Sequence, residues 1–295
     1  MKGEEHYQDI ITIKDKEIRA MDRYIDIKKR LLECANENDE IKSIIAIGSS
    51  TREDVKADEY SDLDLFIVTE DATKWYSGEF PSLLGEVSIS FNEHTLGGGM
   101  ERRCIYDEDR DVDMIILTPA QFEEALKTGV ASWVMNRGYK ILYDINSYEK
   151  MIKRYVKPGH SNPEMTEEEF NNAVNDFYFH NIWAGKKLKR GELWSAKMCV
   201  DAYLKNHLLK MIELYCYEIG GKDVWHDGRF LDKWAGESIV HDLEKCFAHY
   251  NKQDVWNALV ATNKLFEKIT REIAVGKGYA YPDKAAICAK NYLEI

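Results

Sequence analysis

Residues 44–68 read IIAIGSSTREDVKADEYSDLDLFIV, and this stretch decides the fold of the N-terminal half of the chain. It opens with a short apolar run that stops at Gly48 and Ser49, which is typical of a buried strand ending at a turn. A polar stretch follows, and strand character resumes at Asp62. Two strands are therefore predicted, with polar side chains where the first ends and the second begins.

Asp62 and Asp64 form an acidic pair on the second predicted strand. Because they are two residues apart, their side chains point to the same face, while Leu63 and Leu65 point to the other. Neighbouring carboxylates repel each other unless a cation relieves the repulsion, and such oxygen ligands suit Mg²⁺ bound together with substrate phosphates. The pattern predicts a metal site. A solvent-facing strand start would give the same pattern, and this alternative stays open.

A third acid, Asp113, lies within the mainly apolar segment 110–117. We expect its carboxylate to reach the same metal cluster, where it can ligate a second ion or accept a proton from an attacking hydroxyl. Asp111 lies on the same strand face and competes for this role, but Asp113 is deeper in the apolar run. The alternative is that Asp113 only ends the acidic turn at 107–109.

Gly48 and Ser49 are predicted to bind phosphate. Glycine lets the backbone approach a phosphate closely, and serine offers a hydroxyl beside amide donors at an expected helix start. A Gly-Ser pair after a strand is also an ordinary turn. The ordered set is more specific: a strand, Gly48-Ser49, the Asp62-x-Asp64 strand, and a further strand that carries Asp113.

Around this centre, strand and helix patterns alternate up to about residue 127. The predicted elements are a helix over 15–36, strands over 86–91, 102–106 and 111–117, and a helix over 119–127. The last two strands are expected to pair as a hairpin. The first helix has Ile18 and Met21 on its apolar stripe.

After residue 158 only helix patterns follow, and Thr166 with Glu169 has the spacing of a capping box. Helices are predicted over 166–189, 194–219, 238–250 and 254–275, with a short one after Pro282. The aromatic side chains interpreted as helix core are Phe177, Tyr178, Phe179, Trp183 and Trp194. The chain is therefore assigned to the α+β class, with an N-terminal domain over 1–157 and an all-helical domain over 158–295.

Composition and charge narrow the possible partners. Lys and Arg number 40 and Asp and Glu number 52, so that the net charge of −12 disfavours nucleic acid and suits a cationic small molecule. The N-terminus has no signal-peptide pattern, and no apolar run approaches the roughly 20 residues that span a membrane. The six cysteines are widely spaced, as is typical of reduced thiols in the cytoplasm. The expected protein is cytoplasmic and does not bind membranes.

The ordered set in residues 44–68 resembles the signature of the nucleotidyltransferase superfamily of DNA polymerase β type. Four further segments resemble the aminoglycoside 6-adenylyltransferases, which modify streptomycin. They are RDVDMIIL (110–117), KKLKRGELWSAK (186–197), NHLLKMI (206–212) and GYAYPD (278–283). The resemblance covers nearly the whole chain and implies a mixed sheet with flanking helices in the N-terminal catalytic domain, followed by a helical substrate-binding domain.

The resemblance also implies roles for single residues in the N-terminal domain. Gly48, Ser49 and Arg52 would contact the triphosphate of ATP. Asp62 and Asp64 would bind Mg²⁺. Asp113 would be the third acid at the metal and the general base.

In the helical domain, the resemblance implies three more roles. Lys197 would contact phosphate, Glu192 would face the substrate or nucleotide, and Asp176 would line the drug pocket. For Lys197 and Glu192, an ordinary exposed helical face is the alternative. For Asp176, an ordinary structural role is equally open.

The implied function is Mg²⁺-dependent transfer of AMP from ATP to a hydroxyl of a streptomycin-like aminoglycoside, which is an antibiotic-resistance activity. The enzyme is expected to be a monomer or a weak homo-oligomer. One alternative keeps the chemistry and changes the acceptor to a lincosamide or another small molecule. A second is a non-catalytic nucleotide sensor, and an RNA-tailing polymerase is disfavoured by the charge.

Overall fold

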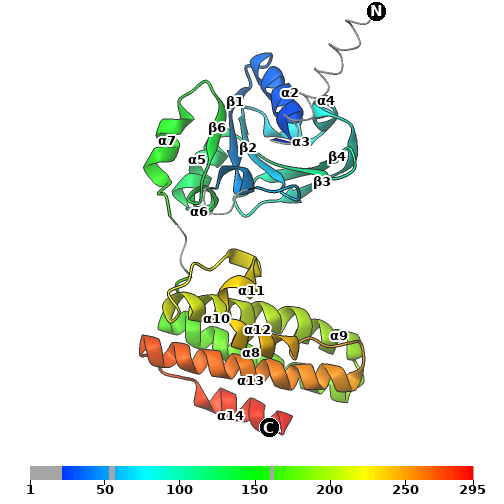
Figure 1. The fold of residues 1–295 in the computed structure, drawn as a ribbon, viewed down its shortest axis with the longest axis vertical. Coiled ribbons are helices and arrows are strands. Elements are labelled where there is room, and N and C mark those ends of the chain that lie inside the picture. The colour runs from blue at the N-terminus through cyan, green and yellow to red at the C-terminus, as the bar shows by residue number, and fades with distance from the viewer. Residues whose placement is uncertain (1–21, 53–56, 160–162, 295) are drawn as a thin grey trace, which may run out of the picture. The chain divides into compact units, whose positions relative to one another are not determined.

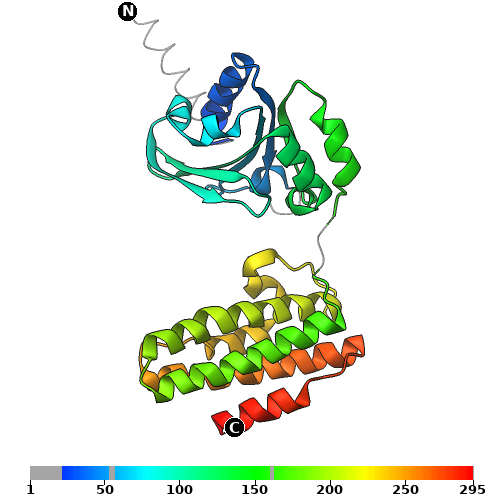
Figure 2. The ribbon, with the colours of Figure 1, turned by 180° about the vertical axis from the view of Figure 1, so that it is seen from behind.

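The computed structural model describes residues 22–52, 57–159 and 163–294, and it divides into two compact units, residues 1–161 and 162–295. The first unit holds a sheet with helices, and the second is built of helices (Figures 1 and 2). This confirms the predicted α+β class. Within the described residues, none of the helices is both long enough and apolar enough to cross a membrane.

The sheet of the first unit has the strand order β3-β4-β5-β2-β1-β6. Its strands are β1 (Ile41–Ile47), β2 (Leu63–Thr69), β3 (Val87–His94), β4 (Met100–Tyr106), β5 (Arg110–Leu117) and β6 (Lys140–Asp144). β2 and β5 run parallel, whereas the other neighbours are antiparallel. The predicted mixed sheet and the β4–β5 hairpin are thus confirmed, while β6 is a strand that was not predicted.

Helices cover both faces of this sheet (Figure 1). They are α2 (Ile25–Asn36), α3 (Ala72–Tyr76), α4 (Phe80–Leu84), α5 (Pro119–Lys127), α6 (Val130–Met135) and α7 (Tyr148–Tyr155). Leu63 and Leu65 belong to the core that β2 forms with α2, α3 and α4. Phe66 and Val68 belong to the opposite core, with α5, α6 and α7. Because side chains alternate along a strand, Asp64 shares the face of Phe66.

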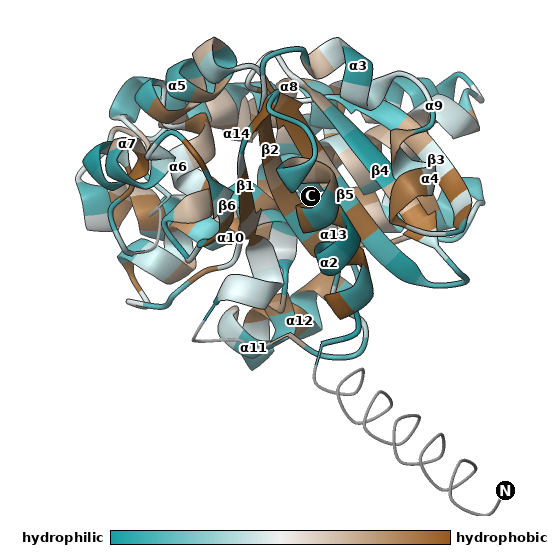
Figure 3. Ribbon diagram, turned by 90° about the horizontal axis from the view of Figure 1, so that it is seen from above, coloured by the Kyte–Doolittle hydropathy of each residue, from teal (hydrophilic) through white to brown (hydrophobic). Residues whose placement is uncertain are grey.

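Strands β1 and β2 are the hydrophobic centre of the sheet (Figure 3). In both strands nearly every residue is buried, which is expected for strands covered on both faces. Asp64 is the polar exception at the end of β2 that pairs with Ile47, the last residue of β1. The apolar strands therefore hold this carboxylate in a fixed position beside the turn that follows β1.

The first helix is shorter than predicted within the described residues. It begins at Ile25, because the Asp22 carboxylate accepts a hydrogen bond from the Tyr24 backbone N–H and holds the chain in a turn. The predicted part over 15–21, with Ile18 and Met21, lies outside the described residues, as does the N-terminal segment considered for an export signal.

Three long helices, α8, α10 and α13, lie side by side in the second unit (Figures 1 and 2). Its helices are α8 (Glu167–Lys189), α9 (Leu193–Met198), α10 (Leu204–Glu218), α11 (Leu231–Trp234), α12 (Glu237–Glu244), α13 (Lys252–Lys277) and α14 (Asp283–Leu293). Phe177 of α8 stacks on Phe266 of α13 with ring centroids 3.5 Å apart. The predicted capping box is present, since Thr166 and Glu169 bond each other's backbone N–H groups.

Three predictions for this unit need correction. A π-helical turn, Cys199–Tyr203, separates α9 from α10, where one helix was predicted. α12 ends at Glu244 and not near Tyr250, because the chain turns and buries Cys246. Phe179 and Trp194 are 64% and 68% exposed and are not core, because the buried stripe of α8 is on another side and α9 buries Ala196 instead.

The capping box provides a test of the helical unit. We expect Thr166→Ala to lower the free energy of unfolding by about 1 kcal/mol, since the Glu169 backbone N–H loses the hydroxyl that accepts its hydrogen bond. Urea unfolding followed by circular dichroism measures the change. Glu169→Gln is the control, because glutamine keeps the reciprocal bond and should cost less. Equal stability of Thr166→Ala and the parent would contradict the capping role.

Candidate active site

Asp64 and Asp113 are directly opposite each other on the parallel strands β2 and β5. Opposite residues on adjacent strands point to the same face of a sheet, so that the two carboxylates lie side by side. Asp62 immediately precedes β2 and is not part of it. Asp111, the competing acid on β5, is exposed and is opposite Ile105 of β4. The register therefore places Asp113, and not Asp111, level with Asp64.

The two carboxylates resist ionisation. Burial raises the pKa of Asp64 to about 7, and the negative charges of Asp62 and Asp113 contribute to the shift. Burial also raises the pKa of Asp113 to about 6, although the positive charge of Arg103 acts in the opposite direction. These shifts are what closely spaced acids show when no cation is present.

Gly48 brings the backbone against the Asp64 carboxylate. Its φ of +71° lies in the left-handed region, and a Cβ atom at this position would overlap Asp64 Oδ2. Ser49 follows in the 3₁₀ turn Gly48–Thr51, and its Oγ lies 3.4 Å from a carboxylate oxygen of Asp62. The turn after β1 is thus packed against the acids, and only glycine fits at its first position.

Two arginines lie near the acids. The positive charge of Arg52 acts against the burial and the acidic neighbours that raise the pKa of Asp64. Arg103 of β4 is opposite Asp113, and its Nε lies 3.6 Å from Asp113 Oδ2. Arg103 also pairs with Glu93 and Glu101. Arg52 was predicted, whereas Arg103 was missed.

The carboxylate oxygens of this site suit magnesium only when a substrate supplies further ligands. Among the described residues, no three or more His, Cys, Asp or Glu side chains stand close enough together to hold a metal ion by themselves. Mg²⁺ is usually held by one or two carboxylates together with substrate phosphates and water, so a complete protein cage is not required. Burial first, and then the negative charges of Asp62 and Asp113, raise the pKa of Asp64, and a bound cation would counter both effects. Asp62 and Asp64 are therefore suited to hold Mg²⁺ that arrives with a phosphate.

In the helical unit, Asp176 is the centre of a hydrogen-bonded cluster. Its carboxylate lies 2.6 Å from His180 Nδ1 and accepts a hydrogen bond of 2.9 Å from the Tyr203 hydroxyl. His207 Nε2 lies 3.6 Å away. The side chain is about one-third exposed, so that it is accessible as well as positioned.

Lys197 and Glu192 have partners within the helical unit. Lys197 Nζ pairs with Asp201 and donates a hydrogen bond to the Ala248 carbonyl oxygen. Glu192 pairs with Lys187 and with Arg190, and the bond to Lys187 holds the pKa of Glu192 below its usual value. Both side chains have ordinary structural partners, and their predicted roles toward phosphate and substrate stay predictions.

Comparison with known proteins gives one consistent result. The model of the family described as streptomycin adenylyltransferase matches residues 21–295. The aminoglycoside 6-adenylyltransferase of Bacillus subtilis is 19% identical over 90% of this chain and 94% of its own length. The enzyme of the same name from Campylobacter jejuni is 21% identical over 85% of this chain and 88% of its own length.

The comparison with solved structures finds the crystal structure of an aminoglycoside 6-adenyltransferase from Bacillus subtilis. It is 16% identical, with a TM-score of 0.43, over 92% of this chain and 95% of that chain.

The repulsion at Asp64 predicts a pH-dependent stability. The folded-state pKa of about 7 lies above the 3.8 that is usual for an aspartate side chain, so the folded state binds the proton more tightly and its stability falls as the pH rises from about 4 to 7. We expect Asp64→Asn to lack this fall. At pH 8, without divalent cations, the variant should be more stable than the parent by about 1–3 kcal/mol.

Urea unfolding at pH 4 and pH 8 in the presence of a chelator measures this difference. Asp39→Asn is the matched control, because Asp39 is exposed and its replacement removes the same charge. An Asp64→Asn protein that gains no stability over the parent between pH 4 and pH 8 would show that the Asp64 carboxylate is not under strain.

Proposed function

This chain belongs to the streptomycin adenylyltransferase family, and we propose that it transfers AMP from ATP to a hydroxyl group of an aminoglycoside. The bond between the α-phosphorus and the bridging oxygen breaks, the acceptor oxygen bonds to the phosphorus, and pyrophosphate leaves. The observation that carries the proposal is the placement of Asp64 and Asp113 side by side, next to the turn that begins at Gly48.

Asp62 and Asp64 would hold Mg²⁺ together with the phosphates of ATP. The bound ion supplies charge neutralisation at the α-phosphate and the leaving pyrophosphate. The protein contributes the fixed position of the carboxylates, since Asp64 belongs to the buried strand β2 and is paired on one side with β1 and on the other with β5. The raised pKa of Asp64 supports this assignment, because an acid that resists ionisation alone gains most from a cation.

Asp113 would accept the proton of the attacking hydroxyl. A general base works best when its pKa lies near the working pH, and the pKa of Asp113 is raised to about 6. The ion pair with Arg103 favours the ionised form that accepts the proton. The carboxylate is part of β5, so its orientation is set by the sheet.

The turn after β1 would bind the triphosphate. Gly48 allows close approach of the backbone, Ser49 supplies a hydroxyl, and Arg52 supplies a positive charge near Asp64. For Lys197 to contact a phosphate, it would have to exchange its bond with Asp201. We therefore propose that the first three residues carry nucleotide binding and that Lys197 assists.

The acceptor would be a polycation. The net charge of −12 favours association with an amine-rich molecule, and Asp176 offers a partly exposed carboxylate on the helical unit. Glu192 is a second candidate for binding the amines of the acceptor. To do so, it would exchange its ion pairs with Lys187 and Arg190 for a pair with the acceptor. Because the donor is ATP, we place the enzyme in the cytoplasm, where its free thiols are also expected.

Pyrophosphate release tests the proposal and the acceptor together. The full chain is incubated with ATP and Mg²⁺ and with streptomycin, kanamycin, spectinomycin, lincomycin or no acceptor. We expect release with streptomycin and a product heavier by one AMP. Release with lincomycin alone would change the acceptor class to a lincosamide. ATP binding without release for any acceptor would contradict an adenylyltransferase and favour a nucleotide sensor.

Replacement of the metal-binding acids should abolish turnover. We expect Asp62→Asn and Asp64→Asn to lower kcat by roughly a hundredfold or more, because charge at the phosphates is no longer neutralised. Steady-state pyrophosphate release measures kcat, and Asp39→Asn is the control with the same loss of charge. Full activity in either site variant would contradict the metal assignment.

Asp113→Asn should separate catalysis from binding. We expect a fall in kcat of about 10²–10⁴-fold, since asparagine cannot accept the proton, with little change in the affinity for ATP. Turnover and equilibrium binding of ATP are measured on the same protein. If ATP affinity falls and kcat at saturation is retained, Asp113 is a binding residue and not the base.

A further inference from the structure

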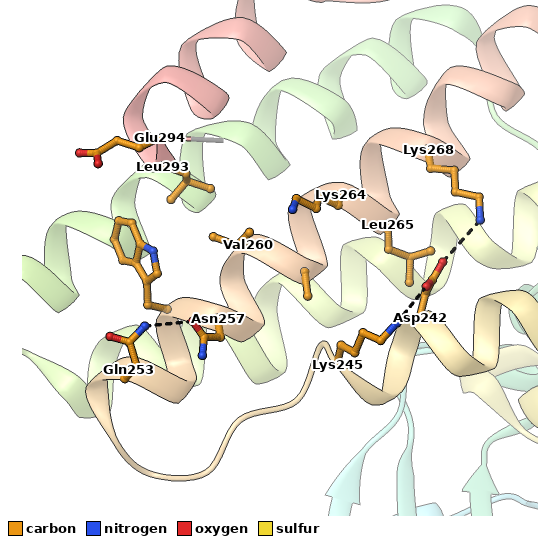
Figure 4. A pocket seen from close by; sticks show the side chains of 12 residues that line it. Asp242, Lys245, Gln253, Asn257, Val260, Lys264, Leu265, Lys268, Leu293 and Glu294 are labelled. Carbon is orange, nitrogen blue, oxygen red and sulfur yellow. Dashed lines mark hydrogen bonds and ion pairs between the residues drawn. The ribbon is translucent and has the colours of Figure 1, made fainter.

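Two hollows of the helical unit lie outside the residues used above. The first has a volume of about 730 Å³ and lies along α13 and the end of α14 (Figure 4). Of its three lysines, Lys245 and Lys268 both pair with Asp242, and Lys264 is exposed to solvent (Figure 4). This hollow specifies no ligand.

The second hollow has a volume of about 420 Å³, which is within the range of small-molecule pockets. It lies between α10, α11 and α12, and every residue that lines it belongs to the helical unit. Its walls are mainly aliphatic and aromatic, with Leu208, Leu209, Ile212, Leu231, Val240, Leu243 and Phe247. Lys205 is the cationic residue of this lining.

Lys205 is a buried cation, with only 9% of its surface exposed. Its Nζ donates hydrogen bonds to the Val200 carbonyl oxygen at 3.0 Å and to Thr262 Oγ1 at 2.8 Å. The Phe247 ring lies 5.1 Å from Nζ. Among the described residues, no carboxylate lies within 4.0 Å of this ammonium group, in contrast to Lys197 on the preceding helix.

Burial lowers the pKa of Lys205 to about 8, and the negative charge of Asp201, which is paired with Lys197, opposes this shift only in part. An ammonium group has three N–H donors, and the two neutral acceptors occupy two of them. The π-helical turn at Cys199–Tyr203 lies directly before α10 and includes Val200, which accepts one of these bonds. Such turns are frequent at functional sites.

We propose that this hollow binds a small apolar monocarboxylate, whose carboxylate pairs with Lys205 and whose hydrocarbon part fills the apolar walls. The ligand would supply the direct ion pair that Lys205 lacks among the described residues, and a charge-assisted hydrogen bond is among the stronger polar contacts. No residue assigned to the adenylyl-transfer reaction lines this site.

The edge of the hollow restricts the ligand to one negative charge. Asp232 and Glu244 are exposed residues of the lining, and they repel a second anionic group. The apolar walls likewise leave no partner for a second charged group. Dicarboxylates and phosphate esters are therefore excluded, and an aliphatic or aryl monocarboxylate fits best.

The test compares octanoate with 1-octanol, which has the same hydrocarbon chain without the charge. Calorimetric titration of the full chain at pH 7 should show octanoate binding at least tenfold tighter than octanol. In Lys205→Met the two ligands should bind equally, because methionine keeps the apolar packing and loses the charge. Lys210→Met is the matched control, since Lys210 is exposed on the same helix, and it should keep the preference.

Two further measurements keep the test decisive. Thermal unfolding checks that Lys205→Met is folded, and we expect its midpoint to be no lower than that of the parent, since an uncompensated buried charge is removed. Leu243→Trp fills the hollow and should weaken octanoate binding at least tenfold. Absence of octanoate binding to the parent, equal binding of octanol, or an unchanged preference in Lys205→Met would each overturn the proposal.

Discussion

The repulsion between carboxylates held side by side is the constraint on which the N-terminal unit depends. Asp64 and Asp113 are fixed by strands whose other residues are mostly buried, so the chain cannot separate them without breaking the centre of the sheet. Gly48 has no side chain because the Asp64 carboxylate occupies the space. We propose that a cation completes this site, and the reaction proposed for the family assigns the cation a role in adenylyl transfer.

The fold was largely predictable, because the signals are local. Apolar runs mark β1 and β2, and the pair Thr166 and Glu169 marks the start of α8. β6 was missed because it is short and only partly buried. Phe179 was misplaced, since residue type alone does not tell which side of a long helix faces the core; it is the packing of α8 that decides this.

The candidate site was predictable where spacing alone determines proximity, as for Asp62 and Asp64. Arg103 required the hairpin register: once Tyr106 is opposite Arg110, Arg103 is opposite Asp113, so the predicted hairpin contained this signal. Lys197 has an acid four residues later on the same helical stretch, and that pair is visible in the sequence. For Lys205, the sequence gives no such signal, because the lack of a direct ion pair among the described residues depends on side chains from several helices.

The central claim is that these acids hold a divalent cation together with ATP. Electron paramagnetic resonance of Mn²⁺, titrated into the full chain with a non-hydrolysable ATP analogue, tests it without reference to any acceptor. The account predicts a protein-bound Mn²⁺ signal that is weakened at least tenfold by Asp64→Asn and retained in Asp39→Asn. Equal Mn²⁺ affinity in the parent and in Asp64→Asn would contradict the account.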